Sequence, residues 1–294
     1  MSIDYGVAPG GYRLPEATQL GPVKLQVSDL ARSVAYYESV IGLHTISRGG
    51  GNARLGTQAD DTMLVGLQEK PGANAVPRRG LLGLYHFAIL VPDRAVLGRF
   101  LRHVASLGVH VGMADHLVSE ALYLTDPDGL GIEVYADRPR ESWKKLDRQI
   151  AMSSDPLDVE SLLDAGGDAP FTGLPVGTVI GHVHLHVGDI ERASHFYHDG
   201  LGFDKMVWNY PGALFLAAGG YHHHLGTNTW ATGAPPAGDG DARLLEWEVQ
   251  VPTGADADAA LGNLESAGHV VDRDSAGGTV SDPWGTRVRV RGQA

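Results

Sequence analysis

The chain has 294 residues, of which 43% are hydrophobic and 20% are charged, the composition of a globular protein long enough for about two domains. It carries 14 histidines and no cysteine, which excludes disulfides, thiolate zinc sites, iron–sulfur clusters and a cysteine nucleophile. A metal site must therefore use histidine, carboxylate or water ligands. The formal net charge of −12 argues against a nucleic-acid or anionic-lipid partner.

The sequence shows no sign of membrane insertion or export. No apolar stretch approaches the roughly 18 residues that a membrane-spanning helix needs. Residues 1–20 lack the charged and then apolar pattern of a signal peptide. We therefore expect a cytoplasmic location and no membrane partner.

In chain order, the predicted elements form a strand–helix–strand–strand–strand unit that occurs four times. The first strands, VKLQV, YHFAILV, VHLHV and LEWEVQV, alternate or run apolar for a few residues, as strands do. Asp29, Asp93 and Asp189 follow the first three strands, where a helix N-cap belongs. Short strands split by Gly-rich turns come after each helix. The units begin near Gly21, Gly83, Gly181 and Leu244.

Two internal matches divide the chain into halves. SDLARSVAYYESVIGL at 28–43 lies over GDIERASHFYHDGLGF at 188–203, an offset of 160 residues. TDPDGLGIEVYAD, which begins at Thr125, lies over SDPWGTRVRV, which begins at Ser281, an offset of 156 residues. Each half therefore contains two of the four units.

These signatures, SDL…A.YYE.VIGL and DPDG.GIEVYAD, resemble those of the vicinal oxygen chelate superfamily, which includes glyoxalase I, extradiol dioxygenases and bleomycin-resistance proteins. Longer strings such as GLYHFAILVPDR and IGHVHLHV resemble the bacterial two-domain catechol 2,3-dioxygenases. The resemblance implies an α+β fold of four βαβββ units, paired into two vicinal oxygen chelate domains with curved mixed sheets. We predict an N-terminal segment at 1–19, a first domain at 20–140, a linker with a short helix at 141–177, and a second domain at 178–294.

The resemblance also implies a divalent metal in a cup between paired units, held by two histidines from first strands and a glutamate from a last strand. This set leaves positions open for substrate and dioxygen on iron(II). Carried over to this sequence, the positions fall on His86, Glu133 and His182. His184 and His186 alternate with His182 on one face of the predicted strand, so His184 is an alternative ligand.

The other two units depart from this pattern. Unit one has Pro22 at the first-strand position, and unit four has Glu246 and Arg289, whose guanidinium has no lone pair to offer. If the units pair one with two and three with four, neither cup receives a full ligand set. If units two and three pair, one cup receives all three predicted ligands. We therefore predict a central site that spans both halves and holds iron(II), with manganese(II) as the alternative.

Ring cleavage also needs proton transfer, for which histidine is suited because its pKa lies near neutrality. The resemblance implies a histidine and a His–Tyr pair beside the open face, and these roles fall on His223, His116 and Tyr123. In a strand, His222 and His224 would face one way and His223 the other, and alignment with Glu133 favours His223. His222 and His224 remain further candidates, and core packing is the alternative role for Tyr123.

The leading function is that of an iron(II)-dependent extradiol dioxygenase acting with O₂ on a small catechol-type or hydroquinone-type aromatic diol. A glyoxalase-type isomerase or lyase is an alternative, although its chemistry usually needs a fourth, carboxylate ligand. A metal-free protein that binds a small molecule such as a drug is another, although such members lack the ligand set. Members of the superfamily often form dimers, so a homodimer is an expected assembly.

Overall fold

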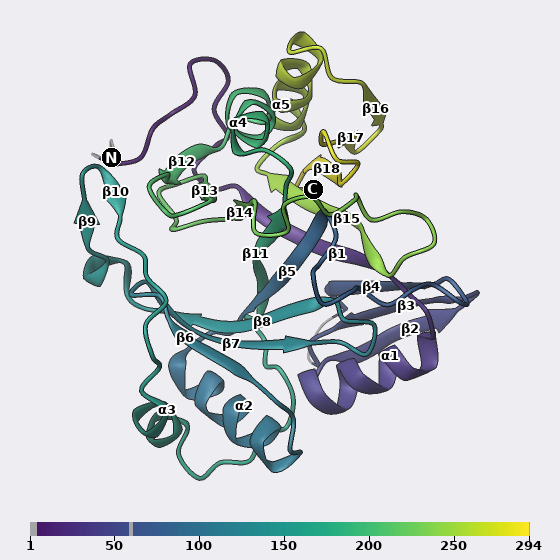
Figure 1. The fold of residues 1–294 in the computed structure, drawn as a ribbon, viewed down its shortest axis with the longest axis vertical. Helices are drawn as coiled ribbons and strands as arrows, with labels where there is room; N and C mark the ends of the chain where they lie inside the picture. Colours follow the sequence, from purple (N-terminus) through teal and green to yellow (C-terminus); the bar gives the residue numbers. More distant parts are fainter. Residues whose placement is uncertain (1–4, 59–60, 294) are drawn as a thin grey trace.

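Two eight-stranded mixed sheets form the body of the protein, whose computed structural model describes residues 5–58 and 61–293. In Figure 1 the sheets curve and their central strands lie close together, with helices on the outside. One sheet has the order β16-β17-β18-β15-β1-β4-β3-β2, and the other has the order β12-β13-β14-β11-β5-β8-β7-β6. All four predicted βαβββ units are present, so the α+β fold is confirmed.

The first sheet is built from units one and four. Unit one comprises β1 (Gln19–Val27), α1 (Leu30–Tyr36) with a π-helical turn at Tyr37–Ile41, β2 (His44–Gly49), β3 (Asn52–Gly56) and β4 (Met63–Glu69). Unit four comprises β15 (Arg243–Val251), α5 (Gly254–Ser266), β16 (Val271–Asp274), β17 (Gly277–Ser281) and β18 (Arg287–Gly292).

The second sheet is built from units two and three. Unit two comprises β5 (Gly83–Leu90), α2 (Arg94–Ser106), β6 (Gly112–Asp115), β7 (Ser119–Thr125) and β8 (Gly131–Asp137). Unit three comprises β11 (Val179–His186), α4 (Ile190–Ser194) with a π-helical turn at His195–Gly200, β12 (Asp204–Val207), β13 (Ala213–Ala217) and β14 (Leu225–Asn228).

The first strands of the paired units lie side by side at the centre of each sheet. β5 pairs with β11 in antiparallel fashion, and β1 pairs with β15 in the same way. The predicted pairing of units two and three is therefore confirmed. Each sheet takes one unit from each sequence half, so the halves 20–140 and 178–294 are repeats of the sequence and not separate sheets.

The predicted N-caps are also confirmed. The carboxylates of Asp29, Asp93 and Asp189 accept hydrogen bonds from backbone N–H groups in the first turns of α1, α2 and α4, at 2.9, 2.8 and 2.7 Å. α5 begins instead with a capping box in which Thr253 and Asp256 bond each other's backbone N–H. These caps fix the residue at which each helix begins after the first strand of its unit. No helix among the described residues is long and apolar enough to cross a membrane.

The segments outside the repeats pack onto the units. Residues 1–4 of the predicted N-terminal segment lie outside the described residues, whereas Val7 forms an antiparallel bridge with Lys205 in β12. The linker carries η2 (Arg140–Ser142), the hairpin of β9 (Lys145–Leu146) and β10 (Gln149–Ile150), and helix α3 (Val159–Gly166). α3 lies against α2 so closely that a Cβ on Gly98 would come within 2.2 Å of the Leu162 carbonyl oxygen.

Replacing Gly98 with alanine is expected to lower the free energy of unfolding by about 1–3 kcal/mol, because the added methyl group overpacks the contact between α2 and α3. Gly262→Ala in α5 is the matched control, since the nearest atom to its new Cβ, on Arg273, would lie 3.9 Å away. The control should gain about 0.5–1 kcal/mol from helix propensity. Urea denaturation followed by circular dichroism measures both, and equal effects would contradict the close packing of α3.

Candidate metal centre and cavity

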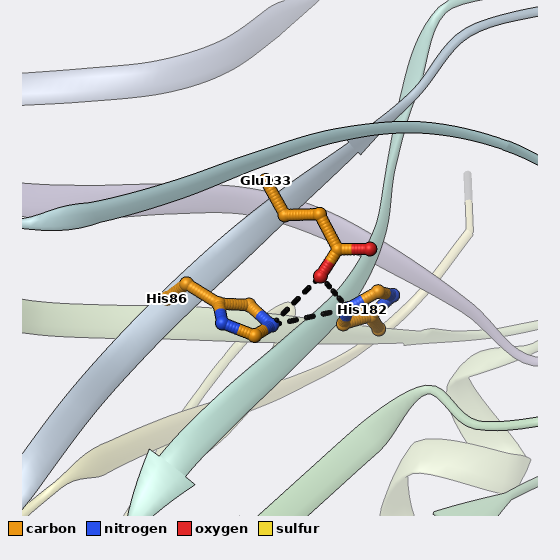
Figure 2. A group of neighbouring side chains, drawn as sticks. All are labelled: His86, Glu133 and His182. Atoms are coloured by element: carbon orange, nitrogen blue, oxygen red, sulfur yellow. Dashed lines mark hydrogen bonds and ion pairs between the residues drawn. The ribbon is translucent and has the colours of Figure 1, made fainter. Parts of the chain in front are cut away.

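Three buried side chains from three strands converge beneath the second sheet's central ladder. His86 comes from β5, Glu133 from β8 and His182 from β11. Glu133 Oε2 lies 3.0 Å from His86 Nε2 and 3.2 Å from His182 Nε2, and the two Nε2 atoms lie 3.4 Å apart (Figure 2). The three residues are at most 5% exposed. The structure thus brings together the three residues predicted as ligands.

The strand register explains this convergence. β5 and β11 run antiparallel with His182 opposite Ala88 and His184 opposite His86, so the two predicted histidine ligands lie diagonally across the ladder. β8 runs parallel to β5 with Glu133 opposite Ala88. Because Ala88 has only a methyl group, the long Glu133 side chain can extend over it toward both rings.

The protonation states suit cation binding. Burial lowers the pKa of His182 to about 4, although Glu133 opposes the shift, so this ring is neutral near pH 7. Burial alone would raise the pKa of Glu133, but His182 and His86 outweigh it by charge attraction and hydrogen bonds and hold the pKa well below its usual value. Neutral imidazoles and an ionised carboxylate are the forms that bind metals.

The donor set fits a divalent cation. The three donor atoms lie within 4.8 Å of one another, and this is the one such group of three in the described part of the chain. A buried carboxylate is costly without a compensating charge, and a bound divalent cation would supply one. Two imidazole nitrogens and one carboxylate oxygen are donor types that divalent transition metals bind.

Among its described residues, the first sheet has no equivalent set. Its matching ladder places Lys24 opposite Glu246, and these side chains form an ion pair at 2.6 Å. Arg289, at the position that corresponds to Glu133, pairs with Asp274 at 2.7 Å. Pro22 stands at the counterpart of His182 and offers no donor, and Arg289 stands at the counterpart of Glu133, as the sequence predicts.

A cavity of about 170 Å³ opens beside the three converging side chains. A cavity of roughly 150 Å³ is enough to hold benzene, so this space matches a single-ring molecule. Its walls are largely aromatic and its only carboxylate among the described residues is Glu133. The lining includes Tyr85, His86, His116, Tyr123, Glu133, His184, Tyr210, Phe215, His223 and Trp230.

His116 and Tyr123 form the predicted pair on one wall. His116 Nδ1 lies 2.6 Å from the Ser153 carbonyl oxygen, which can only accept, so Nδ1 carries the proton. His116 Nε2 therefore accepts from the Tyr123 hydroxyl at 2.6 Å when the ring is neutral. Burial, followed by the charge of Glu133, raises the pKa of Tyr123 well above its usual value, so the phenol stays protonated.

His223 lies on the opposite wall and is held by a chain of buried groups. The Asp137 carboxylate accepts from His222 Nε2 at 2.8 Å, which leaves Nδ1 as an acceptor when the His222 ring is neutral. His223 Nδ1 lies 2.7 Å from that atom and donates to it. The lone pair of the neutral His223 ring is therefore on Nε2, and burial keeps the pKa of the ring well below its usual value.

The predicted strand conformation of His222–His224 is wrong. This run lies in the turn between β13 and β14, because Gly219 and Gly220 adopt positive φ angles of 59° and 68° and end the strand. His222 and His223 therefore touch each other and do not point to opposite faces. His224 accepts from the Ala218 N–H at 3.2 Å and does not line the cavity.

The alignment of His223 with Glu133 is also wrong. In the ladders, Glu133 stands opposite Ala88 in unit two, and Gly226 stands opposite His184 in unit three. Gly226 is thus the counterpart of Glu133. His223 lines the cavity by virtue of its turn and not by strand register.

Sequence reasoning missed two polar groups that hold the cavity histidines. Asp137 ends the GIEVYAD motif, and Asn228 ends β14 and contacts both His184 and His186. The acidic end of the motif was a signal for Asp137. No sequence pattern indicated the role of Asn228, because its contact with His184 joins two strands whose residues lie more than 40 positions apart.

Comparisons with known proteins agree with this architecture. The model of the Glyoxalase/Bleomycin resistance protein/Dioxygenase superfamily matches residues 19–134 and 179–290. A catechol-2,3-dioxygenase of Bacillus subtilis (strain 168) is 44% identical over 273 residues, which cover 91% of this chain and 95% of that protein.

Solved structures share the fold at low sequence identity. Glyoxalase I from Zea mays superposes with a TM-score of 0.57 at 20% identity, covering 94% of this chain and 92% of its own. The cppA protein from Streptococcus pneumoniae TIGR4 has a TM-score of 0.58 at 12% identity, covering 99% of this chain and 100% of its own.

Anaerobic addition of Mn²⁺ or Fe²⁺ to metal-free protein is expected to raise Tm, because a ligand that binds only the folded state stabilises it. His182→Ala should abolish this shift and the bound metal. His195→Ala, at an exposed position on the π-helical turn after α4, is the control and should keep both. Stoichiometric metal in the His182→Ala protein, measured by elemental analysis, would contradict the site.

Proposed function

Because the chain belongs to the Glyoxalase/Bleomycin resistance protein/Dioxygenase superfamily, we propose that it is an extradiol dioxygenase that cleaves a small catechol-type aromatic diol with O₂. The observation that carries the proposal is the convergence of His86, Glu133 and His182 at a buried point beside an aromatic cavity of single-ring size. The 44% identity to a catechol-2,3-dioxygenase over nearly the full length supports the same reaction class.

His86, Glu133 and His182 would hold the metal, iron(II) by preference and manganese(II) as the alternative. The metal would supply a Lewis acid and a redox-capable centre that binds diol and O₂ together. The protein contributes orientation, exclusion of bulk water and proton transfer. A divalent cation would also compensate the charge of the buried Glu133 carboxylate.

His223 is suited to accept a proton from the diol. Its Nε2 carries a lone pair, its Nδ1–H is engaged by His222, and its ring lies 4.1 Å from the His182 ring, centroid to centroid. Proton transfer by a positioned histidine typically contributes a large factor to rate. The same ring can return the proton later in the cycle, since its neighbours fix only its Nδ1 side.

Tyr123 and His116 are suited to orient the diol from the other wall. The Tyr123 O–H is given to His116, so the phenol oxygen has lone pairs left to accept a hydrogen bond from a bound hydroxyl group. His116 in turn is fixed by the Ser153 carbonyl. Tyr123 lies in the cavity wall, and this position gives it a role beyond the core packing considered from sequence.

The two alternative functions have less support. A glyoxalase-type isomerase needs a second carboxylate near the metal, but Gly226 is the counterpart of Glu133. A metal-free binding protein has no use for a buried carboxylate between two imidazoles.

The proposal predicts that protein loaded anaerobically with Fe²⁺ consumes one O₂ per catechol and forms a yellow ring-fission product. An oxygen electrode and visible absorbance measure the two events against a panel of catechols and hydroquinones. Absence of oxygen uptake by the metal-loaded protein with every diol would overturn the proposal. Isomerisation of a glutathione hemithioacetal in its place would establish the glyoxalase-type alternative.

Replacing His223 with phenylalanine is expected to lower kcat by about 10²–10⁴-fold with little change in metal content, because the proton acceptor is lost. Asp137→Asn should cause a smaller loss and shift the pH dependence of kcat, because it weakens the hold on His222. Asp199→Asn, an exposed carboxylate-to-amide change, is the matched control. An unchanged pH profile in Asp137→Asn would argue against the Asp137–His222–His223 chain.

A further inference from the structure

His184 occupies a special position in the cavity wall. Units two and three are related across the β5–β11 ladder, where His182 faces Ala88 and His184 faces His86. This relation makes His184 the counterpart of Ala88. In unit two, Ala88 leaves room for the long side chain of Glu133. In unit three, Gly226 leaves room for the imidazole of His184.

The close fit between His184 and Gly226 shows that the ring position is built into the sheet. A Cβ on Gly226 would lie 2.8 Å from His184 Cγ, so any side chain there would displace the ring. Tyr85, Phe215 and Trp230 surround it, with ring centroids 5.2, 5.6 and 5.5 Å away. The imidazole is thus fixed among aromatic groups that offer it no strong acceptor.

Hydrogen bonds around Asn228 determine which nitrogen of His184 carries the proton. The Trp230 backbone N–H donates to Asn228 Oδ1 at 3.0 Å, which identifies that atom as the oxygen. His186 Nδ1 donates to the same oxygen at 2.7 Å. Asn228 Nδ2 must then donate to His184 Nε2 at 2.9 Å. His184 is therefore neutral, with its proton on Nδ1.

This proton has no acceptor among the residues that the structure describes. Nδ1 of His184 has no hydrogen-bond partner among the described residues. It is not one of their solvent-inaccessible polar atoms that lack a partner, whereas His182 Nδ1 is one of these. The cavity that His184 lines is the space open to it. A donor in such apolar surroundings gains most from an acceptor brought by a ligand.

We propose that His184 donates a hydrogen bond from Nδ1 to an oxygen atom of the bound aromatic ligand, and that Asn228 and His186 are positioning residues that hold this tautomer. The identification of the ligand as an aromatic diol rests on the proposed function. His184 is thereby a substrate-binding residue and not a metal ligand, because Asn228 already occupies its Nε2 lone pair.

The tautomer is tested directly by ¹⁵N NMR of histidine-labelled protein, with His184 assigned from the signals missing in His184→Phe. The expected pattern is a proton-bearing Nδ1 and a bare Nε2. A proton on Nε2 would overturn the inference, whether or not the protein is active.

Ligand binding is tested with 4-nitrocatechol added anaerobically to Mn²⁺-loaded protein and followed by absorbance. His184→Phe is expected to raise Kd about three- to ten-fold, the loss of one neutral hydrogen bond, with metal content unchanged. His184→Asn is the matched variant, because its amide nitrogen can take the place of Nδ1 and should restore much of the affinity. Binding by His184→Phe within two-fold of the wild-type protein would overturn the inference.

The outcomes separate this inference from the proposed function. Wild-type protein that binds 4-nitrocatechol through His184 but cleaves no diol contradicts only the dioxygenase proposal. Wild-type protein that cleaves catechols while His184→Phe binds them equally well contradicts only the inference. Wild-type protein that neither binds nor cleaves any diol contradicts both.

Discussion

The antiparallel ladder between β5 and β11 is the constraint on which the rest of the site depends. It joins strands from different halves of the sequence and sets His86 and His182 diagonally across one face. Because side chains alternate along a strand, a shift of one residue in either strand would turn its histidine into the core. The parallel neighbour β8 then places Glu133 between them. The three donors come from distant segments of the sequence, and they meet because the register between β5 and β11 is fixed.

The same ladder in the first sheet shows that the fold alone does not make a site. β1 and β15 pair as β5 and β11 do, but the positions equivalent to the three ligands hold Pro22, Glu246 and Arg289. Glu246 forms an ion pair with Lys24. An ion pair between side chains balances a buried carboxylate as a metal would, without leaving open positions for a ligand. Duplication of the unit thus gave two frameworks of equal geometry, of which one carries the converging donors. Function in this architecture lies in a few side chains per sheet.

Much of the fold was predictable from sequence because its determinants are local or repetitive. The four units follow from strand patterns and three aspartate caps, and the ligand inventory was enough to predict which units pair. What escaped prediction depends on contacts between distant segments. Asp137 meets His222 across 85 residues, and Asn228 meets His184 across 44. The turn at Gly219 and Gly220 changed the geometry of the three-histidine run, since positive φ ended a strand that composition alone favoured.

Two of the cavity histidines outside the converging triad, His223 and His184, differ in what they offer, although both rings are neutral. His223 faces the cavity with a lone pair because Asp137 and His222 take up its proton side. His184 faces it with a proton because Asn228 takes up its lone pair. A neutral imidazole has one donor and one acceptor nitrogen, so the hydrogen-bond partner of one nitrogen determines what the other nitrogen presents to the cavity. An aromatic diol needs both an acceptor for the proton it loses and a donor for the oxygen that then carries charge. Fixed opposite tautomers in the cavity lining supply this polarity before any ligand enters, and Glu133 is the one carboxylate among the described residues of that lining.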